Sequence, residues 1–163
     1  SKYFIGSTSI VTYSDAINAC SINGAVLTTI INESDFIEAQ SVCNGRWCWI
    51  GLNNINNEHI WEYIDGTSVS GTYGFDLFGN ATIGKGPWGV SQPDNWNNWE
   101  NCVNFSPNQY NRWNDYGCWN NYMYPLCMRN ESQIKCNAVN SNSKDLSSNN
   151  IIRSSDSVPV YCP

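Results

Sequence analysis

The sequence predicts an α+β domain held together by disulfide bonds. Helical periodicity is confined to two early segments, and short strands separated by irregular loops follow, a segregation typical of α+β folds. Eight cysteines occur in 163 residues. Only Cys43 and Cys48 are close in sequence and His59 is the single histidine, which disfavours zinc. An even number of cysteines in a short chain favours disulfides formed in an oxidising compartment.

Two helices are expected near the start of the chain. Ser14 is suited to the N-cap of a helix that continues through Asn23 and ends at Gly24. Asn32 is suited to the N-cap of a second helix. Its apolar residues share one face, as an amphipathic helix requires; they are Phe36, Ala39 and Cys43.

Short strands are expected along the rest of the first 129 residues, at 3–11, 26–30, 49–52, 60–64, 102–105 and 122–128. The segment 67–90 is different, because it is rich in glycine, serine, threonine and aromatic residues and shows no period. A loop of that length in a compact domain is expected to be functional or folded on itself.

The composition changes after Arg129. Residues 137–157 are dominated by asparagine and serine, which favours a poorly packed tail. We therefore expect a domain at 1–129 and an extension at 130–163 that Cys136 and Cys162 bracket.

Charge and motifs restrict the cellular setting. The net charge of −6 disfavours nucleic acids and anionic membrane surfaces as partners. No apolar run is long enough to insert across a membrane. With the cysteines, this predicts a secreted or cell-surface protein. Four N-x-[ST] triplets agree with that setting but also arise by chance; they begin at Asn32, Asn80, Asn104 and Asn130.

Several short motifs occur in one order that resembles the C-type lectin-like domain family. The resemblance covers about residues 2–129 and predicts that family's fold: two helices, small antiparallel sheets and a long calcium-binding loop region. The motifs are 13–16 (YSDA) before Cys20, 27–30 (LTTI), 49–52 (WIGL), Trp61 with 65–66 (DG), 92–94 (QPD), 100–102 (ENC), 113–115 (WND) with Cys118, and Cys127.

The resemblance also implies a disulfide pattern, although eight cysteines allow 105 pairings on sequence alone. The family pattern implies Cys20 with Cys127 and Cys102 with Cys118. The four remaining cysteines would then pair locally, as Cys43 with Cys48 and Cys136 with Cys162.

The resemblance further implies a calcium site that binds carbohydrate. Calcium prefers six to eight oxygen ligands from carboxylates and amides, and the segment 92–115 is rich in them. The positions that match the family's five side-chain ligands are Gln92, Asp94, Glu100, Asn114 and Asp115. Two further coordination positions would be left for vicinal sugar hydroxyls, which Gln92, Asp94, Glu100 and Asn114 would also hydrogen-bond.

The triplet Gln92-Pro93-Asp94 indicates the class of sugar. In this family a Gln-Pro-Asp triplet goes with galactose-type ligands and a Glu-Pro-Asn triplet with mannose-type ligands, because amide and carboxylate exchange places. Trp96 follows Asp94 by two residues, as in galactose-type members, and an aromatic ring there can pack on galactose. The resemblance also implies a cis peptide bond before Pro93.

Other candidates carry weaker signals. Asn95 and Asn101 stand where members with an auxiliary calcium site carry carboxylates, so we expect that site to be absent or weak. Trp88 and Trp99 are candidates for stacking on an extended glycan, with packing inside the loop as the alternative. His59 is expected to be exposed.

Three functions are to be distinguished: a galactose- or N-acetylgalactosamine-binding lectin, a calcium-dependent domain that binds a protein or an ice surface instead, and an enzyme. The sequence disfavours an enzyme, since it has no nucleophile–base pair and no histidine-based metal centre. A shallow single site binds sugar weakly, so multivalency through oligomers or a larger parent chain is expected.

Overall fold

The computed structural model describes residues 2–129, 151–152 and 160–161. The residues Tyr3–Met128 form one compact unit. In the other unit, β8 (Ile151–Ile152) pairs antiparallel with β9 (Val160–Tyr161). The expected Cys136–Cys162 bridge lies outside the described residues, and the extension at 130–163 is described only at β8 and β9.

Helix α1 (Tyr13–Ile22) has its N-cap two residues before the expected one. Its N-cap is Thr12, whose hydroxyl accepts a hydrogen bond from the Asp15 N–H at 3.3 Å, so the prediction of Ser14 was wrong. A bridge between Val11 and Met123 holds the chain extended up to Thr12. This pairing with a distant segment sets the start of the helix.

Helix α2 (Glu33–Cys43) begins where the sequence predicts. The Asn32 side chain accepts from the Asp35 N–H at 2.9 Å, which confirms Asn32 as the N-cap. Phe36, Ala39 and Cys43 are buried on one face.

The unit contains one sheet with the strand order β1-β7-β3-β5-β6. β2 also pairs with β7, and β4 pairs with β3. Every pairing is antiparallel except that of β3 with β7, which is parallel and departs from the antiparallel sheets expected. The strands are β1 (Tyr3–Ile5), β2 (Val26–Leu27), β3 (Cys48–Asn53), β4 (Glu62–Tyr63), β5 (Glu100–Ser106), β6 (Arg112–Gly117) and β7 (Tyr124–Met128).

The strand predictions were correct in position but not in length. The first covers only three residues and the second two, where 3–11 and 26–30 were expected. β6 was missed, because Arg112, Asn114 and Asp115 interrupt the alternation of apolar and polar residues.

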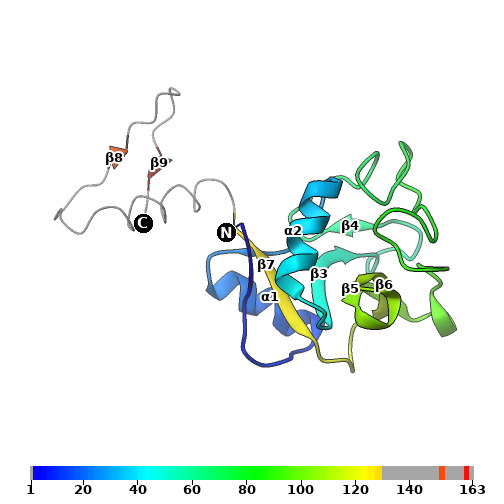
Figure 1. Cartoon of the computed structure of the whole chain (residues 1–163), viewed down its shortest axis with the longest axis horizontal. Coiled ribbons are helices and arrows are strands. Elements are labelled where there is room, and N and C mark those ends of the chain that lie inside the picture. The colour runs from blue at the N-terminus through cyan, green and yellow to red at the C-terminus, as the bar shows by residue number, and fades with distance from the viewer. Residues whose placement is uncertain (1, 130–150, 153–159, 162–163) are drawn as a thin grey trace. The chain divides into compact units, whose positions relative to one another are not determined.

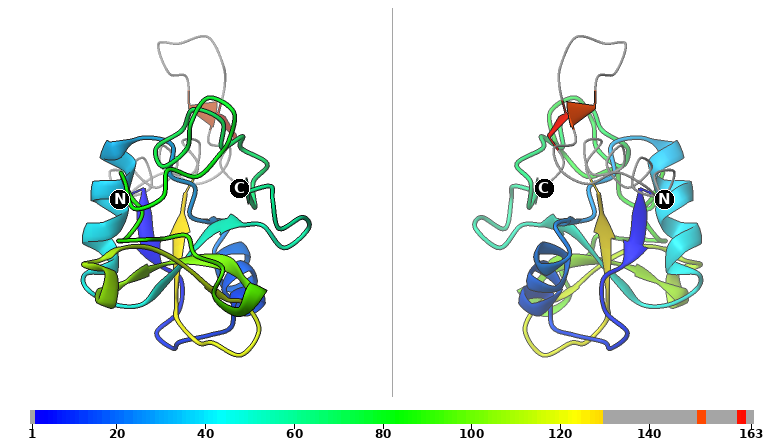
Figure 2. Two further views of the ribbon diagram at one scale, coloured as in Figure 1. Left: turned by 90° about the vertical axis from the view of Figure 1, so that its right-hand side faces the viewer. Right: turned by 90° about the vertical axis from the view of Figure 1, so that its left-hand side faces the viewer.

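The two helices lie on either side of β7 (Figure 2). Each belongs to a separate hydrophobic cluster: Phe36 and Ala39 of α2 to one, Tyr13 and Ala16 of α1 to the other. A helix thus packs against each side of the sheet, and the loops between the strands remain to form the candidate site.

Among residues 2–129, three disulfides join the predicted partners: Cys20–Cys127, Cys43–Cys48 and Cys102–Cys118. The first closes a separation of 107 residues and the third links β5 to the end of β6. Bridges over long loops typically stabilise a fold by about 2–4 kcal/mol.

The segment between β4 and β5 lies on the side of the unit away from β1 (Figure 1). It folds around Trp88, which is fully buried and whose Nε1 donates to the Gly74 carbonyl at 3.0 Å. A Cβ at Gly74 would collide with Pro87 at 2.7 Å and would lie within 3.2 Å of the rings of Trp88 and Trp113. The expectation that this long segment is folded on itself is confirmed.

Neither α1 nor α2, the helices in the described part of the chain, has the length and apolarity needed to cross a bilayer.

Candidate functional site

Three carboxylates meet beside the sheet. Asp94 lies in the loop that precedes β5, Glu100 is the first residue of β5, and Asp115 lies in β6. One carboxylate oxygen from each lies within 4.8 Å of the others. The sequence-predicted acidic residues are therefore brought together by one loop and two paired strands.

The pairing of β5 with β6 sets the position of the two strand residues. Val103 is opposite Asp115 and Asn104 is opposite Asn114, while a register irregularity separates Glu100 from Cys102. Asn114 and Asp115 are buried although successive strand residues point to opposite faces. The Asn114 amide nitrogen donates to the Asp115 carbonyl at 2.8 Å, and its own side-chain oxygen is not used in that bond.

Asp115 holds the preceding loop through its carboxylate. Its Oδ1 accepts from the Asp94 N–H at 3.0 Å and its Oδ2 from the Asn95 N–H at 2.8 Å. Each carboxylate oxygen carries a second lone pair, so these bonds leave it able to ligate a cation.

Asn95 braces Glu100, a role that the sequence analysis missed. Its side-chain oxygen accepts from the Glu100 N–H at 3.2 Å, and Glu100 Oε2 accepts from the Trp96 N–H at 3.0 Å. Asn95 has a φ of 46°, a left-handed conformation that asparagine tolerates better than most residues. An asparagine between two candidate acidic ligands was the signal available in the sequence.

Gln92 precedes the carboxylate cluster in the chain and is a further candidate ligand. The Gln92–Pro93 peptide bond is cis, which confirms that prediction. The Gln92 side chain is buried, and its Oε1 has no hydrogen-bond partner among the described residues. Its backbone carbonyl accepts from the Gly84 N–H at 2.8 Å, so the segment folded around Trp88 supports it.

The electrostatics of the cluster favour a cation. Burial, the largest cause, together with the negative charges of Asp115 and Asp94 raises the pKa of Glu100 to about 8, against the opposing hydrogen bond from the Trp96 N–H. Burial also raises the pKa of Asp115 to about 6, against the opposing bonds from the Asn95 and Asp94 N–H groups. A bound cation would favour the charged form of both groups.

The donor set fits calcium. All five candidate ligands offer oxygen, three as carboxylates and two as carboxamides, and no histidine or free thiolate lies in the described cluster. Hard oxygen ligands suit calcium rather than zinc. The buried, unpartnered Gln92 Oε1 is the atom that a cation would satisfy.

The aromatic candidates separate into exposed and buried groups. Trp96 begins the short helix η1 (Trp96–Asn98) and is 60% exposed beside the cluster. Trp99 is 39% exposed. Trp88 is fully buried in the core of the loop segment, so the structure supports the packing alternative for this residue and excludes stacking on a glycan.

The two asparagines at the expected auxiliary position serve structural bonds. Asn95 braces Glu100, and the Asn101 amide nitrogen donates to the Asn54 side-chain oxygen at 3.0 Å. His59 is exposed, as expected. β5 continues into the short helix η2 (Pro107–Gln109), which leads to β6.

Comparison with known proteins identifies the family. The family described as the Lectin C-type domain matches residues 9–129. The chain is 32% identical over 117 residues to the CD209 antigen of Symphalangus syndactylus, covering 71% of this chain and 26% of that protein. It is 33% identical over 118 residues to CD209 antigen-like protein 2 of Macaca mulatta, covering 71% and 40%. The chain thus spans less than half the length of these relatives.

A solved structure agrees with this match. The trimeric structure of the Kupffer cell C-type lectin receptor Clec4f superposes with a TM-score of 0.61 at 27% identity, covering 79% of this chain and 78% of that one. Since the sequence match spans most of the chain and the fold agrees, the chain belongs to the C-type lectin domain family.

Proposed function

We propose that this domain binds terminal galactose or N-acetylgalactosamine through a calcium ion held by Gln92, Asp94, Glu100, Asn114 and Asp115. The family consists of carbohydrate-recognition domains, which are binding modules and not enzymes. The observation that carries the proposal is the trio of carboxylates within 4.8 Å beside the unpartnered Gln92 oxygen.

The charge count supports a reversible calcium site. Three carboxylates against a divalent cation leave one excess negative charge, as suits a moderate-affinity extracellular site. When bound, calcium would supply coordination positions for two vicinal sugar hydroxyls. The side chains of Gln92, Asp94, Glu100 and Asn114 would hydrogen-bond the same hydroxyls and fix their orientation.

The galactose class is supported by the order of the amide and the carboxylate around Pro93. Gln92 precedes the cis bond and Asp94 follows it. Trp96 is mostly exposed beside this pair, and its indole offers an apolar face on which a galactose ring can pack. Specificity then arises from hydrogen-bond geometry and one stacking contact.

The setting of this binding is extracellular, secreted or at a cell surface, in agreement with the disulfides found in the described part of the chain. A single shallow site is expected to bind one sugar with a Kd on the order of millimolar. Useful avidity therefore requires several copies, either as an oligomer or as part of a longer chain.

A glycan array in calcium and in excess chelator tests the proposal. We expect binding to terminal galactose or N-acetylgalactosamine in calcium and its loss in chelator. Asp115→Asn should lose calcium and sugar together, whereas Glu38→Gln, on an exposed position of α2, should keep both.

Each other outcome has a definite meaning. If the wild type bound mannose or fucose, the calcium site would stand but the galactose class would be wrong. In the double variant Gln92→Glu with Asp94→Asn, by contrast, we expect the preference to change from galactose to mannose. Calcium binding without any glycan would favour a protein or ice ligand. Sugar binding unaffected by chelator would contradict the site itself.

A further inference from the structure

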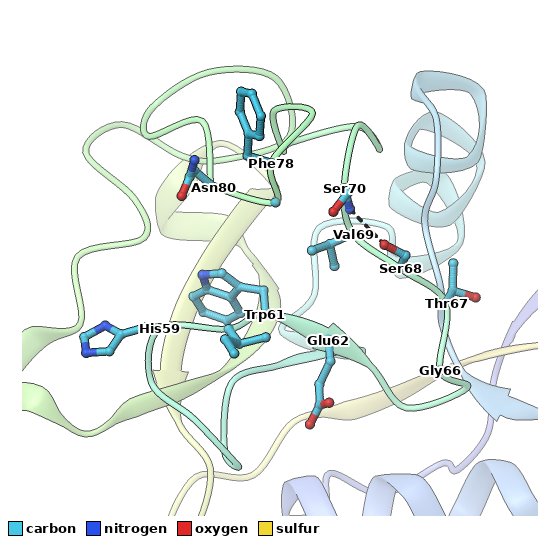
Figure 3. Close-up of a pocket in the computed structure, with 12 residues that line it drawn as sticks. His59, Trp61, Glu62, Gly66, Thr67, Ser68, Val69, Ser70, Phe78 and Asn80 are labelled. Atoms are coloured by element: carbon cyan, nitrogen blue, oxygen red, sulfur yellow. Dashed lines mark hydrogen bonds between the residues drawn. The ribbon is translucent and has the colours of Figure 1, made fainter.

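A second pocket lies apart from the residues assigned to calcium. Its volume is about 280 Å³, and it is lined by three segments: 59–62, 66–70 and 78–80. Figure 3 shows Trp61 in the middle of these segments, with Val69 to one side and Phe78 and Asn80 above it. None of the proposed calcium ligands lines this pocket.

The upper wall is a tight hairpin within the long segment. Phe75 bridges Ala81 at its base. The Asp76 carboxylate accepts from the N–H groups of Phe78 and Asn80 at 2.8 and 2.9 Å and orders the turn. Gly79 has a φ of 84°, and a Cβ there would lie 3.3 Å from Ser70 Oγ, so this turn and the 66–70 wall fit closely.

An acceptor triplet for N-linked glycosylation stands on this hairpin. Asn80-Ala81-Thr82 satisfies the N-x-[ST] rule, and Asn80 is exposed while it lines the pocket. Phe78, two residues earlier, is 88% exposed on an otherwise ordered turn. An exposed large aromatic residue beside an acceptor asparagine is explained if a sugar covers it.

The other described triplets offer no such surroundings. Asn104 is fully buried in β5, so the folded domain has no room for a glycan there. Asn32 serves as the N-cap of α2 and lines neither this pocket nor its walls.

We propose that Asn80 carries an N-linked glycan whose first sugar residue lies in this pocket, against Trp61 and Phe78. The donor is an oligosaccharide linked to a lipid pyrophosphate. The Asn80 Nδ2 forms a bond to the anomeric carbon, the bond from that carbon to the pyrophosphate oxygen breaks, and one amide proton leaves. The attached nitrogen keeps its second hydrogen, so its 2.9 Å bond to Asp76 Oδ2 persists.

The lining suits a single sugar ring. Trp61 and Val69 supply apolar surface for the faces of the ring, while the hydroxyls of Ser68 and Ser70 and the ring of His59 supply hydrogen-bonding groups around it. Trp61 is held from behind by Trp88, at a centroid distance of 5.5 Å. The pocket floor is therefore held in place by contacts within the protein.

The first test measures attachment in the full chain secreted from a eukaryotic host. Intact mass and glycopeptide mapping should show a glycan at Asn80. Asn80→Gln should lose it, and Thr82→Ser, which preserves both the triplet and the hydroxyl that bonds the Gly74 carbonyl, should retain it. An unmodified Asn80 in the wild-type peptide would overturn the proposal.

The second test measures contact with the pocket. An amidase that releases N-glycans should act on the native protein more slowly than on the denatured protein, with chelator present so that lectin activity has no part. Phe78→Ala should speed native release about tenfold, equivalent to about 1.4 kcal/mol of lost packing. Leu77→Ala is the matched control, since Leu77 is 81% exposed on the same turn but does not line the pocket.

Release at the wild-type rate in Leu77→Ala, with faster release in Phe78→Ala, would support the pocket contact. Equal rates in the wild type and Phe78→Ala, or equal acceleration in both variants, would overturn it, because the aromatic ring would then contribute nothing specific. Neither test depends on whether the calcium site binds sugar.

Discussion

The long segment 67–90 and the loop 92–99 that follows it are ordered by different interactions. The first closes on a cluster of aromatic rings: Trp88 packs edge-on against Trp113 at 5.4 Å and lies 5.5 Å from Trp61. The second closes on three carboxylates within 4.8 Å. The aromatic cluster is stabilised by its own burial. In the carboxylate cluster, burial and the neighbouring negative charges raise the pKa values of Glu100 and Asp115, and a bound cation would offset both effects.

The two clusters therefore have different roles: the aromatic cluster supports the backbone next to the proposed calcium site, and the carboxylate cluster forms that site. The aromatic cluster positions the backbone of Gln92 through Gly84, and the carboxylates hold 94–96 through backbone N–H groups. Loss of packing should therefore damage both regions, while loss of the cation should affect mainly the carboxylate loop.

The largest effect is expected from Trp88→Ala. Removing a fully buried tryptophan ring should lower the free energy of unfolding by about 3–5 kcal/mol, and calcium affinity should fall because Gln92 loses its support. Denaturant unfolding with the disulfides intact, together with calcium titration, measures both. Unchanged calcium affinity in a folded variant would break the proposed dependence of one region on the other.

Calcium removal should have the next largest effect. A ligand that binds only the folded state at 100 times its Kd stabilises it by about 2.7 kcal/mol. Thermal unfolding with calcium and with chelator should show this difference in the wild type and none in Asp115→Asn. A melting temperature that ignores chelator would contradict a calcium-dependent loop.

Acidity should weaken calcium binding. The pKa values of about 8 for Glu100 and about 6 for Asp115 lie above their ordinary values, so protons compete with the cation, and affinity should fall by up to about tenfold per pH unit below pH 8. Without calcium, the folded state binds more protons than the unfolded state. Its stability should therefore fall as the pH rises through this range.

Calcium titration and denaturant unfolding between pH 6 and pH 8 test both signs. Calcium affinity that stays constant over this range would contradict the raised carboxyl pKa values. If the stability of the metal-free protein rose with pH, the pKa values of Glu100 and Asp115 would be lowered and not raised on folding.

The smallest effect is expected from Trp96→Ala. An exposed aromatic contact contributes about 0.5–1.5 kcal/mol, so galactose affinity should fall by a few-fold to about tenfold. Calcium affinity should stay unchanged, because the Trp96 backbone N–H still donates to Glu100. Parallel sugar and calcium titrations measure the two, and a joint loss would make Trp96 a structural residue instead.

The sequence alone determined much of this domain. The order of the motifs predicted the family, because each motif is a short local pattern, and the family resemblance in turn implied the Cys20–Cys127, Cys102–Cys118 and Cys43–Cys48 pairs. The N-cap Asn32 and the strand at 49–52 were predicted for the same reason, since capping and burial patterns act over a few residues. The five proposed calcium ligands also came from motif positions.

Only the tertiary structure decided the rest. The start of α1 at Thr12 depends on a bridge to Met123, and the burial of Trp88 depends on rings brought from β6 and the 59–62 segment. β6 lacks a strand-like pattern because its polar residues face the site. Contacts between residues far apart in the chain fixed these features, and no short window of sequence contains both partners.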